Sequence, residues 1–261
     1  MLSSILSEKL PVAVIDSGIG GISVLRELVA LMPNEDFIFF GDEANAPYGT
    51  KKPEQVREIT FRNVEMLFSE YHAKAAVIAC NTATGAAVSP LRKAYPNIPI
   101  IGIEPEIKSA AMLPGHPKVL IMATPLTLRQ PKFIALRERF ETDAEFVPLP
   151  CPGLMELIES GHTGDELLHR YLTSLFSGLE DRHFDAVVLG CTHYPHVRES
   201  ISEFFPDAAL FDGCRGTAAE TRRRLETAGL LCKNSNNGTL KFITTSDNPQ
   251  FEKTCLKLMS M

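Results

Sequence analysis

The feature that most constrains this chain is a regular alternation of short apolar runs with longer segments of helical character. Pro11 to Ile15, Asp36 to Phe40 and Ala76 to Ala79 have the length and apolar content of buried strands. The pattern begins again at Lys118 to Ala123 and continues to Ala186 to Leu189. Strands that alternate with helices imply parallel sheets joined by right-handed crossovers. The sequence therefore predicts an α/β fold built from two equivalent halves.

The length and composition are compatible with two such halves. A chain of 261 residues with 44% hydrophobic residues can bury two cores. We expect a first domain formed by residues 1–97 and 210–261, and a second domain formed by residues 98–209. The chain would then cross between the domains twice and leave a cleft between them.

Two of the apolar runs end at a cysteine that is followed by small polar residues. Cys80-Asn81-Thr82 follows one run, and Cys191-Thr192-His193 follows the equivalent run in the other half. Open α/β sheets bind ligands at the carboxyl ends of their strands, and a helix N-terminus at that point would lower a thiol pKa. A single buried cysteine is commonly packing material. Two of them, one from each half, could face a substrate from opposite sides, as inversion of a stereocentre requires.

Two further loops are expected to reach the same cleft. Asp16-Ser17-Gly18 follows the first strand, and a phosphate-binding glycine turn is one interpretation of it. However, Ser23 replaces the third glycine of that motif and Asp16 would repel phosphate, so a general base or an amine ligand is the better interpretation. The loop Pro47-Tyr48-Gly49-Thr50 is either a surface turn or a carboxylate-binding loop that offers a phenol and backbone amides.

Several classes of function find no support. A net charge of −6, with Arg222-Arg223-Arg224 as the single basic run, argues against nucleic acid as a partner. No apolar run approaches the ~18 residues of a membrane span, and the first ten residues do not resemble a signal peptide, so we expect a cytoplasmic protein with free thiols. Cys191-x-His193-x-x-His196 could bind a metal, but Pro195 interrupts it and no further ligand completes it, so no metal site is expected.

The motifs, in their order along the chain, resemble those of the glutamate racemase family. The matching segments cover nearly the whole chain: Asp16 to Gly21, Pro47-Tyr48-Gly49, Cys80 to Ala83, Gly102 to Pro105, Cys151 to Glu159, Gly190 to Pro195 and Ile243 to Phe251. The resemblance implies a cofactor-independent enzyme that interconverts L- and D-glutamate and supplies D-glutamate for peptidoglycan. It also implies a homodimer, and two doubly wound parallel-sheet domains related by pseudo-two-fold symmetry with the active site in the cleft between them.

The resemblance further implies residue roles. Cys80 would exchange the α-proton on the D face, assisted by Asp16, and Cys191 would exchange it on the L face, assisted by His193. Glu159 would support this machinery, with Glu156, one helical turn earlier, as the alternative. The residues that would hold the substrate are Asp16, Ser17, Pro47, Tyr48, Gly49, Asn81, Thr82, Thr124, Thr192 and His193.

Thr124 lies where this chain departs from the family pattern. Many family members have Gly-Thr-x-Gly-Thr at this point, whereas this chain has Ala123-Thr124-Pro125-Leu126-Thr127. Thr124 keeps a hydroxyl at the strand end, but Pro125 stiffens the expected polar turn and removes an amide donor. A role for Thr124 in substrate binding is therefore a hypothesis.

The chemistry explains why two thiols are needed. The α-proton of an amino acid is very weakly acidic, and no lysine occupies a strand end where it could bind pyridoxal phosphate as an electron sink. A cofactor-free site must surround the carboxylate with donors, exclude water and activate thiols whose ordinary pKa is about 8.5. One thiol must begin as thiolate and the other as thiol. Two alternatives remain open: an aspartate racemase, because pocket depth sets substrate length, and a non-catalytic protein that binds acidic amino acids.

Overall fold

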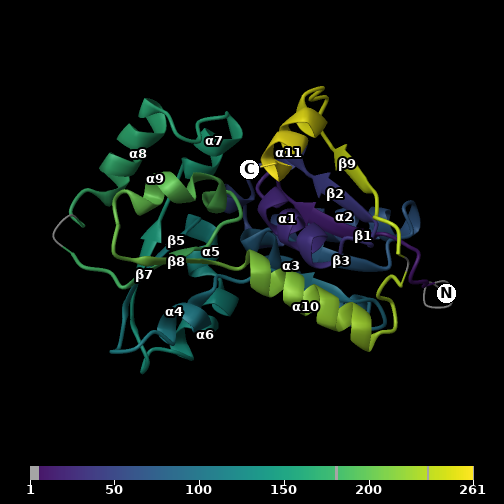
Figure 1. Cartoon of the computed structure of the whole chain (residues 1–261), viewed down its shortest axis with the longest axis horizontal. Coiled ribbons are helices and arrows are strands. Elements are labelled where there is room, and N and C mark those ends of the chain that lie inside the picture. Colours follow the sequence, from purple (N-terminus) through teal and green to yellow (C-terminus); the bar gives the residue numbers. More distant parts are fainter. Residues whose placement is uncertain (1–5, 180–181, 234, 261) are drawn as a thin grey trace.

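The computed structural model, which describes residues 6–179, 182–233 and 235–260, contains two separate sheets of parallel strands (Figure 1). The five-stranded sheet has the order β4-β3-β1-β2-β9, and the four-stranded sheet has the order β6-β5-β7-β8. This confirms the expected α/β class with two parallel-sheet domains. The strands are β1 (Val12–Asp16), β2 (Phe37–Gly41), β3 (Ala75–Ile78), β4 (Ile100–Gly102), β5 (Lys118–Ala123), β6 (Glu145–Pro150), β7 (Ala186–Leu189), β8 (Ala209–Asp212) and β9 (Leu240–Thr244).

Helices cover both faces of each sheet, because alternate residues of a buried strand point to opposite faces. In β1, Val12 and Val14 pack under α1 (Ile22–Leu31), α10 (Cys214–Thr227) and α11 (Phe251–Met259). Ala13 and Ile15 pack under α2 (Pro53–Ser69) and α3 (Asn81–Ala94) on the opposite face. We call this five-stranded sheet with its helices the first unit.

The second unit is built in the same way around the four-stranded sheet. Leu120 and Met122 of β5 pack under α7 (Leu154–Glu159), α8 (Glu166–Phe176) and α9 (Arg198–Ser202). Val119 and Ile121 pack under α4 (Ile107–Ala111) and α6 (Pro131–Glu138). The remaining short elements are α5 (Pro125–Arg129) and the 3-10 turns η2 (Glu43–Asn45), η3 (Tyr48–Thr50) and η4 (Tyr194–Val197).

The two sheets repeat one strand order. Taken in chain order within each unit, β4-β3-β1-β2 and β8-β7-β5-β6 both have the order fourth, third, first, second, and β9 extends only the first sheet. The third strands, β3 and β7, therefore occupy equivalent positions beside the first strands, β1 and β5. The change of winding direction lies between first and third strands, which is where doubly wound sheets bind ligands. Both cysteine loops begin at this point.

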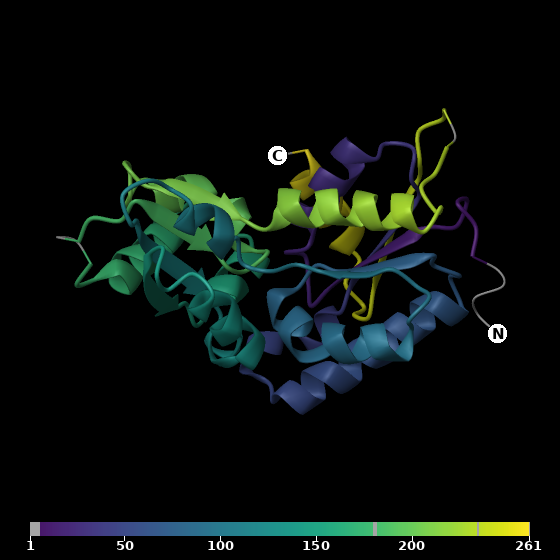
Figure 2. The same ribbon diagram turned by 90° about the horizontal axis from the view of Figure 1, so that it is seen from below.

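Strand pairing moves the limits expected for the two domains. β4 pairs with β3, although residues from 98 onward were expected in the second domain, and β8 pairs with β7, although residues from 210 onward were expected in the first. Sheet membership depends on which strand lies alongside, and that is a non-local property. The chain crosses between the units after Gly102 and returns after Asp212, from which α10 lies over the first unit (Figure 2). None of the helices in the described residues has the length and apolar character that crossing a bilayer requires.

Candidate active site

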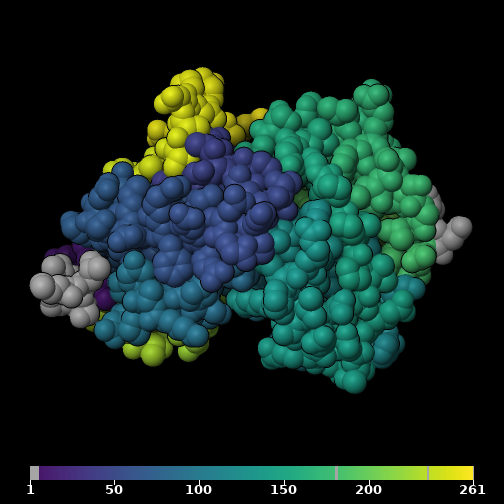
Figure 3. Space-filling view, turned by 180° about the vertical axis from the view of Figure 1, so that it is seen from behind, coloured from purple at the N-terminus to yellow at the C-terminus, as the bar shows by residue number. Residues whose placement is uncertain are grey.

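A small cavity lies where the two units meet. In the space-filling view of Figure 3, residues of the first unit meet residues of the second unit along a seam. Strand-end loops of both units supply most of the cavity wall. The cavity volume is about 20 Å³, which is room for roughly one water molecule. A molecule of the size of glutamate therefore does not fit into the cavity without a rearrangement of its walls. The lining residues are Ser17, Tyr48, Gly49, Cys80, Asn81, Thr82, Thr124, Thr127, Met155, Gly190, Cys191, Thr192 and His193.

Cys191, which follows β7, lies at the end of a chain of contacts. Its Sγ is 3.7 Å from Nδ1 of His193, and Nε2 of the same ring is 2.5 Å from Oε1 of Glu159. Glu159 also accepts a hydrogen bond of 3.0 Å from the backbone N–H of Ile19 in the first unit. Glu156, the alternative to Glu159, is exposed on the same helix. The structure therefore brings Glu159, not Glu156, to His193.

The electrostatics of this chain of contacts favour a protonated ring. Burial opposes a charged imidazole, but the hydrogen bonds to Cys191 and Glu159 and the Glu159 charge raise the His193 pKa well above its ordinary value. Burial likewise opposes ionisation of Glu159, yet His193 lowers the Glu159 pKa. An imidazolium beside a thiol can stabilise the thiolate and can return a proton to it. His196 does not join this group, because burial lowers its pKa to about 4 and its Nε2 lies 3.4 Å from the Gly20 carbonyl.

Cys80, which follows β3, has different surroundings. It immediately precedes the fourteen-residue helix α3, and its Sγ lies 3.8 Å from the Ser17 hydroxyl. Burial, followed by the nearby Asp16 charge, raises the Cys80 pKa to about 12. Both thiols were expected at a helix N-terminus, but Cys191 instead leads into a turn and the 3-10 helix η4, which begins at Tyr194 and has Pro195 in its first turn. The two thiols therefore differ in how each can be activated.

Asp16 connects the two units at the floor of the site. Its Oδ1 accepts the backbone N–H of Gly18 at 2.9 Å, and its Oδ2 accepts the Thr192 hydroxyl at 3.1 Å. Burial raises the pKa of Asp16 above its ordinary value. A buried carboxyl group of raised pKa holds a proton more readily than an exposed one does. Both carboxylate oxygens of Asp16 are thus held by Gly18 and Thr192, and the general-base role expected of Asp16 stays a prediction.

A cluster of three threonine hydroxyls forms another wall. Oγ1 of Thr82 lies 3.1 Å from those of both Thr124 and Thr127, which are 2.9 Å from each other. The expected polar turn at 124–129 is wrong, because Thr124 caps the helix α5 and Pro125 occupies its first position. Proline suits that position, where the missing N–H would have had no helical partner. Thr127 was not predicted to line the site. The sequence signal for it was its position three residues after Thr124, where an N-cap threonine accepts a hydrogen bond from the backbone.

The Tyr48 loop corrects another expectation. The phenol was expected to hold a substrate carboxylate, but Tyr48 is buried and its hydroxyl donates at 2.5 Å to Oδ2 of Asp42. Asn63 donates to the same oxygen at 3.0 Å. Pro47 does not line the cavity. Asp42 was missed by the sequence reasoning, and its only signal was its place directly after the second strand.

Asn81 carries an unusual buried acceptor. Its Oδ1 is the one buried side-chain N or O atom without a hydrogen-bond partner among the residues that the structure describes. An unsatisfied buried acceptor costs about 1–3 kcal/mol, and this one belongs to a residue that lines the cavity. A positively charged N–H donor, such as the ammonium group of an amino acid, would satisfy it. Met155 supplies an apolar part of the wall and was also not predicted.

Comparison with known proteins agrees with this geometry. Residues 8–221 match the model of the Asp/Glu/Hydantoin racemase family. The chain is 48% identical over 235 residues to a glutamate racemase of Clostridium acetobutylicum, with 90% of this chain and 91% of the relative covered. A glutamate racemase structure from Bacillus anthracis has a TM-score of 0.87 at 28% identity, covering 97% of this chain and 95% of that one. One from Francisella tularensis, in complex with D-glutamate, has a TM-score of 0.84 at 28% identity and the same coverage of both chains.

Proposed function

We propose that this chain, which belongs to the Asp/Glu/Hydantoin racemase family, interconverts L- and D-glutamate by proton transfer between two thiols, without a cofactor. The observation that carries this proposal is that Cys80 and Cys191 line one small cavity, each from the loop after an equivalent strand of its own unit. Two acid–base groups on opposite sides of one carbon are what inversion requires.

The proton balance is simple in either direction. With L-glutamate bound, the Cys191 thiolate removes the α-proton while the Cys80 thiol delivers its own proton to the opposite face. The products are D-glutamate, a Cys191 thiol and a Cys80 thiolate, and the reverse reaction restores the starting state. His193, supported by Glu159, holds or returns the proton of Cys191, and Asp16 does so for Cys80. Each thiol thus has its own acid–base assistant.

The cavity wall supplies the groups that would hold the substrate. The free Oδ1 of Asn81 accepts the substrate ammonium, and the hydroxyls of Thr82, Thr124 and Thr127 donate to a carboxylate. Backbone amides of the Ser17 and Gly49 loops complete the donors, and the Thr192 hydroxyl, which itself donates to Asp16, can accept a hydrogen bond from the substrate ammonium. Tyr48 shapes the wall through its hydrogen bond to Asp42, and contributes no free phenol donor. Donors fixed in a closed cavity stabilise the carbanion-like transition state more strongly than water does.

The wider role follows from the product. D-glutamate made by this reaction supplies peptidoglycan synthesis, which places the enzyme in the cytoplasm of a bacterium, and a homodimer is its expected assembly. Light scattering on the purified protein measures the assembly directly, and a monomer at micromolar concentration would remove that part of the proposal.

Proton NMR in D₂O without added cofactor tests the reaction. The purified protein should replace the α-proton of L-glutamate by deuterium while D-glutamate accumulates. Cys80→Ala and Cys191→Ala should each abolish racemisation, whereas Cys232→Ala, a half-buried cysteine remote from the cavity, should not. Exchange with aspartate but not glutamate would make the protein an aspartate racemase. Exchange with neither would leave a binding protein, and racemisation by the double alanine variant would exclude the two-thiol mechanism.

A further inference from the structure

The long helix α2 buries two polar side chains on the face that packs against the first-unit sheet. Thr60 is fully buried, and its hydroxyl donates at 2.7 Å to the Val56 carbonyl within the same helix. Asn63 is 5% exposed, and its amide donates at 3.0 Å to Oδ2 of Asp42, outside the helix. A buried amide costs free energy unless it is paired. Asn63 is therefore matched to a particular partner, whereas Thr60 is satisfied by its own helix.

That partner, Asp42, is a fully buried carboxylate on which four side-chain donors converge. Its Oδ2 accepts the Tyr48 hydroxyl at 2.5 Å and the Asn63 amide at 3.0 Å. Its Oδ1 accepts the Asn45 amide at 2.9 Å and the Thr245 hydroxyl at 2.7 Å. All four donors are neutral, so the carboxylate depends on the complete set for its stabilisation. Removal of one donor is therefore expected to move the others, the phenol among them.

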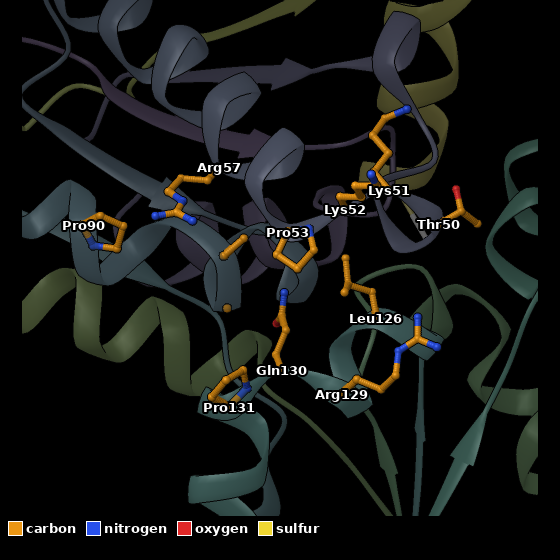
Figure 4. A pocket seen from close by; sticks show the side chains of 12 residues that line it. Thr50, Lys51, Lys52, Pro53, Arg57, Pro90, Leu126, Arg129, Gln130 and Pro131 are labelled. Atoms are coloured by element: carbon orange, nitrogen blue, oxygen red, sulfur yellow. The ribbon is translucent and has the colours of Figure 1, made fainter.

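Tyr48 needs such an anchor because it belongs to a very short element. The turn η3 has only three residues, and in Figure 4 the residues that follow Tyr48, from Thr50 to Pro53, border an open hollow of about 560 Å³. Packing on that side therefore does not fix the turn. The buried Tyr48 ring is tied through its hydroxyl to Asp42, whose backbone N–H donates at 3.0 Å to the Asp16 carbonyl.

The Asn63 amide also lies directly beside the phenol. Its Nδ2 is 3.5 Å from the Tyr48 hydroxyl oxygen, so Asn63, Asp42 and Tyr48 contact one another in a closed triangle. The next residue of the turn, Gly49, is confined as well, because a Cβ there would lie 3.0 Å from Cβ of Thr124 in the second unit. We propose that Asn63 is a positioning residue of the racemase site, which acts through Asp42 to hold Tyr48 and the η3 turn at the cavity wall. This role rests on the proposed function.

The expected kinetic effect is on substrate binding. The Tyr48 hydroxyl donates to Asp42 and takes no part in the proposed proton transfers, so a displaced ring changes the space offered to glutamate more than it changes the thiols. A hydrogen bond to a charged group changes an equilibrium constant by at least about tenfold. Because only part of that loss reaches the cavity, we expect removal of the Asn63 amide to raise KM about 5-fold and to lower kcat less than about twofold.

Variants on one helix face test this role. Asn63→Leu removes the amide and keeps a side chain of similar size, and Asn63→Ala takes its place if leucine prevents folding. Thr60→Val, one helical turn earlier, is the matched control, since it also makes a buried polar side chain apolar but leaves the contact with Asp42 in place. Thr60→Val should leave KM unchanged. Asn63→Leu combined with Asp42→Asn should raise KM by less than the product of the separate effects, because both act through one contact.

Fluorine NMR follows the Tyr48 ring without any need for turnover. The chain has five tyrosines, so protein labelled with 3-fluorotyrosine should give a resonance from each, and Tyr48→Phe identifies the one from Tyr48. Asn63→Leu should shift that resonance, whereas Thr60→Val should leave it in place. A protein that shows this pattern but does not racemise glutamate would contradict the proposed reaction and not the coupling between Asn63 and Tyr48.

Any of three results would overturn the proposal. A Tyr48 resonance that keeps its position in the Asn63 variants would mean that the phenol is held without Asn63. An equal rise of KM in Thr60→Val would mean that any loss of a polar group from this helix face weakens binding. A fall of kcat by a larger factor than the rise of KM would mean general damage to the site and not displacement of its wall.

Discussion

Replacing Glu159 by glutamine tests the contact between α7 and the His193 ring. Glu159 offers one oxygen, Oε1, to both Nε2 of His193 at 2.5 Å and the Ile19 amide at 3.0 Å. Glutamine has nearly the same size but no charge, so packing is kept while the anion that stabilises the imidazolium is lost. The substitution therefore separates the electrostatic contribution of Glu159 from its shape.

The size of the effect follows from the kind of bond removed. A hydrogen bond between charged partners contributes about 1.5–3 kcal/mol, and each 1.4 kcal/mol corresponds to about tenfold in rate. We expect kcat/KM to fall between about 10-fold and about 150-fold. The global stability should change less, because the Glu159 side chain remains 21% exposed and water can solvate the new amide.

The pH profile gives a second, independent readout. Burial lowers the pKa of His193, and hydrogen bonds to Cys191 and Glu159 outweigh it, so loss of the Glu159 charge must lower that pKa. His193 then loses its proton at lower pH, and the alkaline limb of activity should move toward lower pH. Glu156→Gln, the exposed neighbour on the same helix, should change kcat/KM less than twofold. Equal kinetics and unshifted pH profiles in the two variants would refute the role of Glu159.

Three further substitutions test other contacts. Gly20→Ala would place a Cβ 2.3 Å from Nδ1 of His193, so the ring must shift and activity should fall more than tenfold. Urea denaturation should show that the free energy of unfolding falls by only about 1–3 kcal/mol. Unaltered activity would mean that the position of the ring does not matter. Lys74→Met leaves the buried Glu35 without its ion-pair partner at 2.5 Å, and the free energy of unfolding should fall by about 3–5 kcal/mol. Adding Glu35→Gln to this variant should restore part of that loss, because no unpaired charge then remains buried. A loss below about 1 kcal/mol for Lys74→Met would contradict this expectation. Asp42→Asn weakens the hydrogen bond to the Tyr48 hydroxyl and should raise KM by a larger factor than it lowers kcat. Steady-state kinetics in which kcat falls by the larger factor would argue against a role of Asp42 in positioning Tyr48.

The strands and helices were predictable because their signals are local. β1, β3 and β7 are continuous apolar runs that end at polar residues, and the structure has strands at each of them. β4 is a short apolar run as well, but nothing in Ile100–Gly102 specifies that it pairs with β3. Local pattern identifies an element, whereas its place in a sheet depends on residues far along the chain.

The site shows the same division. The positions of both cysteines at equivalent strand ends followed from pattern alone. The partner of Tyr48 did not, because the hydrogen bond from the phenol to Asp42 depends on how the chain turns through η2 and η3 between the two residues. The choice of Glu159 over Glu156 likewise depends on the direction in which α7 points toward His193, a residue 34 positions away. The catalytic roles of these residues stay predictions until the variants are measured.

The unlike surroundings of the two thiols have a consequence for the energetics of turnover. L- and D-glutamate are mirror images with equal free energy in water, so the equilibrium constant of their interconversion is one, whatever side chains surround Cys80 and Cys191. The ratio kcat/KM must then be identical for the two enantiomers. In the proposed mechanism, Asp16 on one side and His193 with Glu159 on the other instead set how the unliganded enzyme divides between two protonation forms, each ready for one enantiomer. The asymmetry of the protein can appear only as a kcat and a KM that differ between the two directions by one common factor.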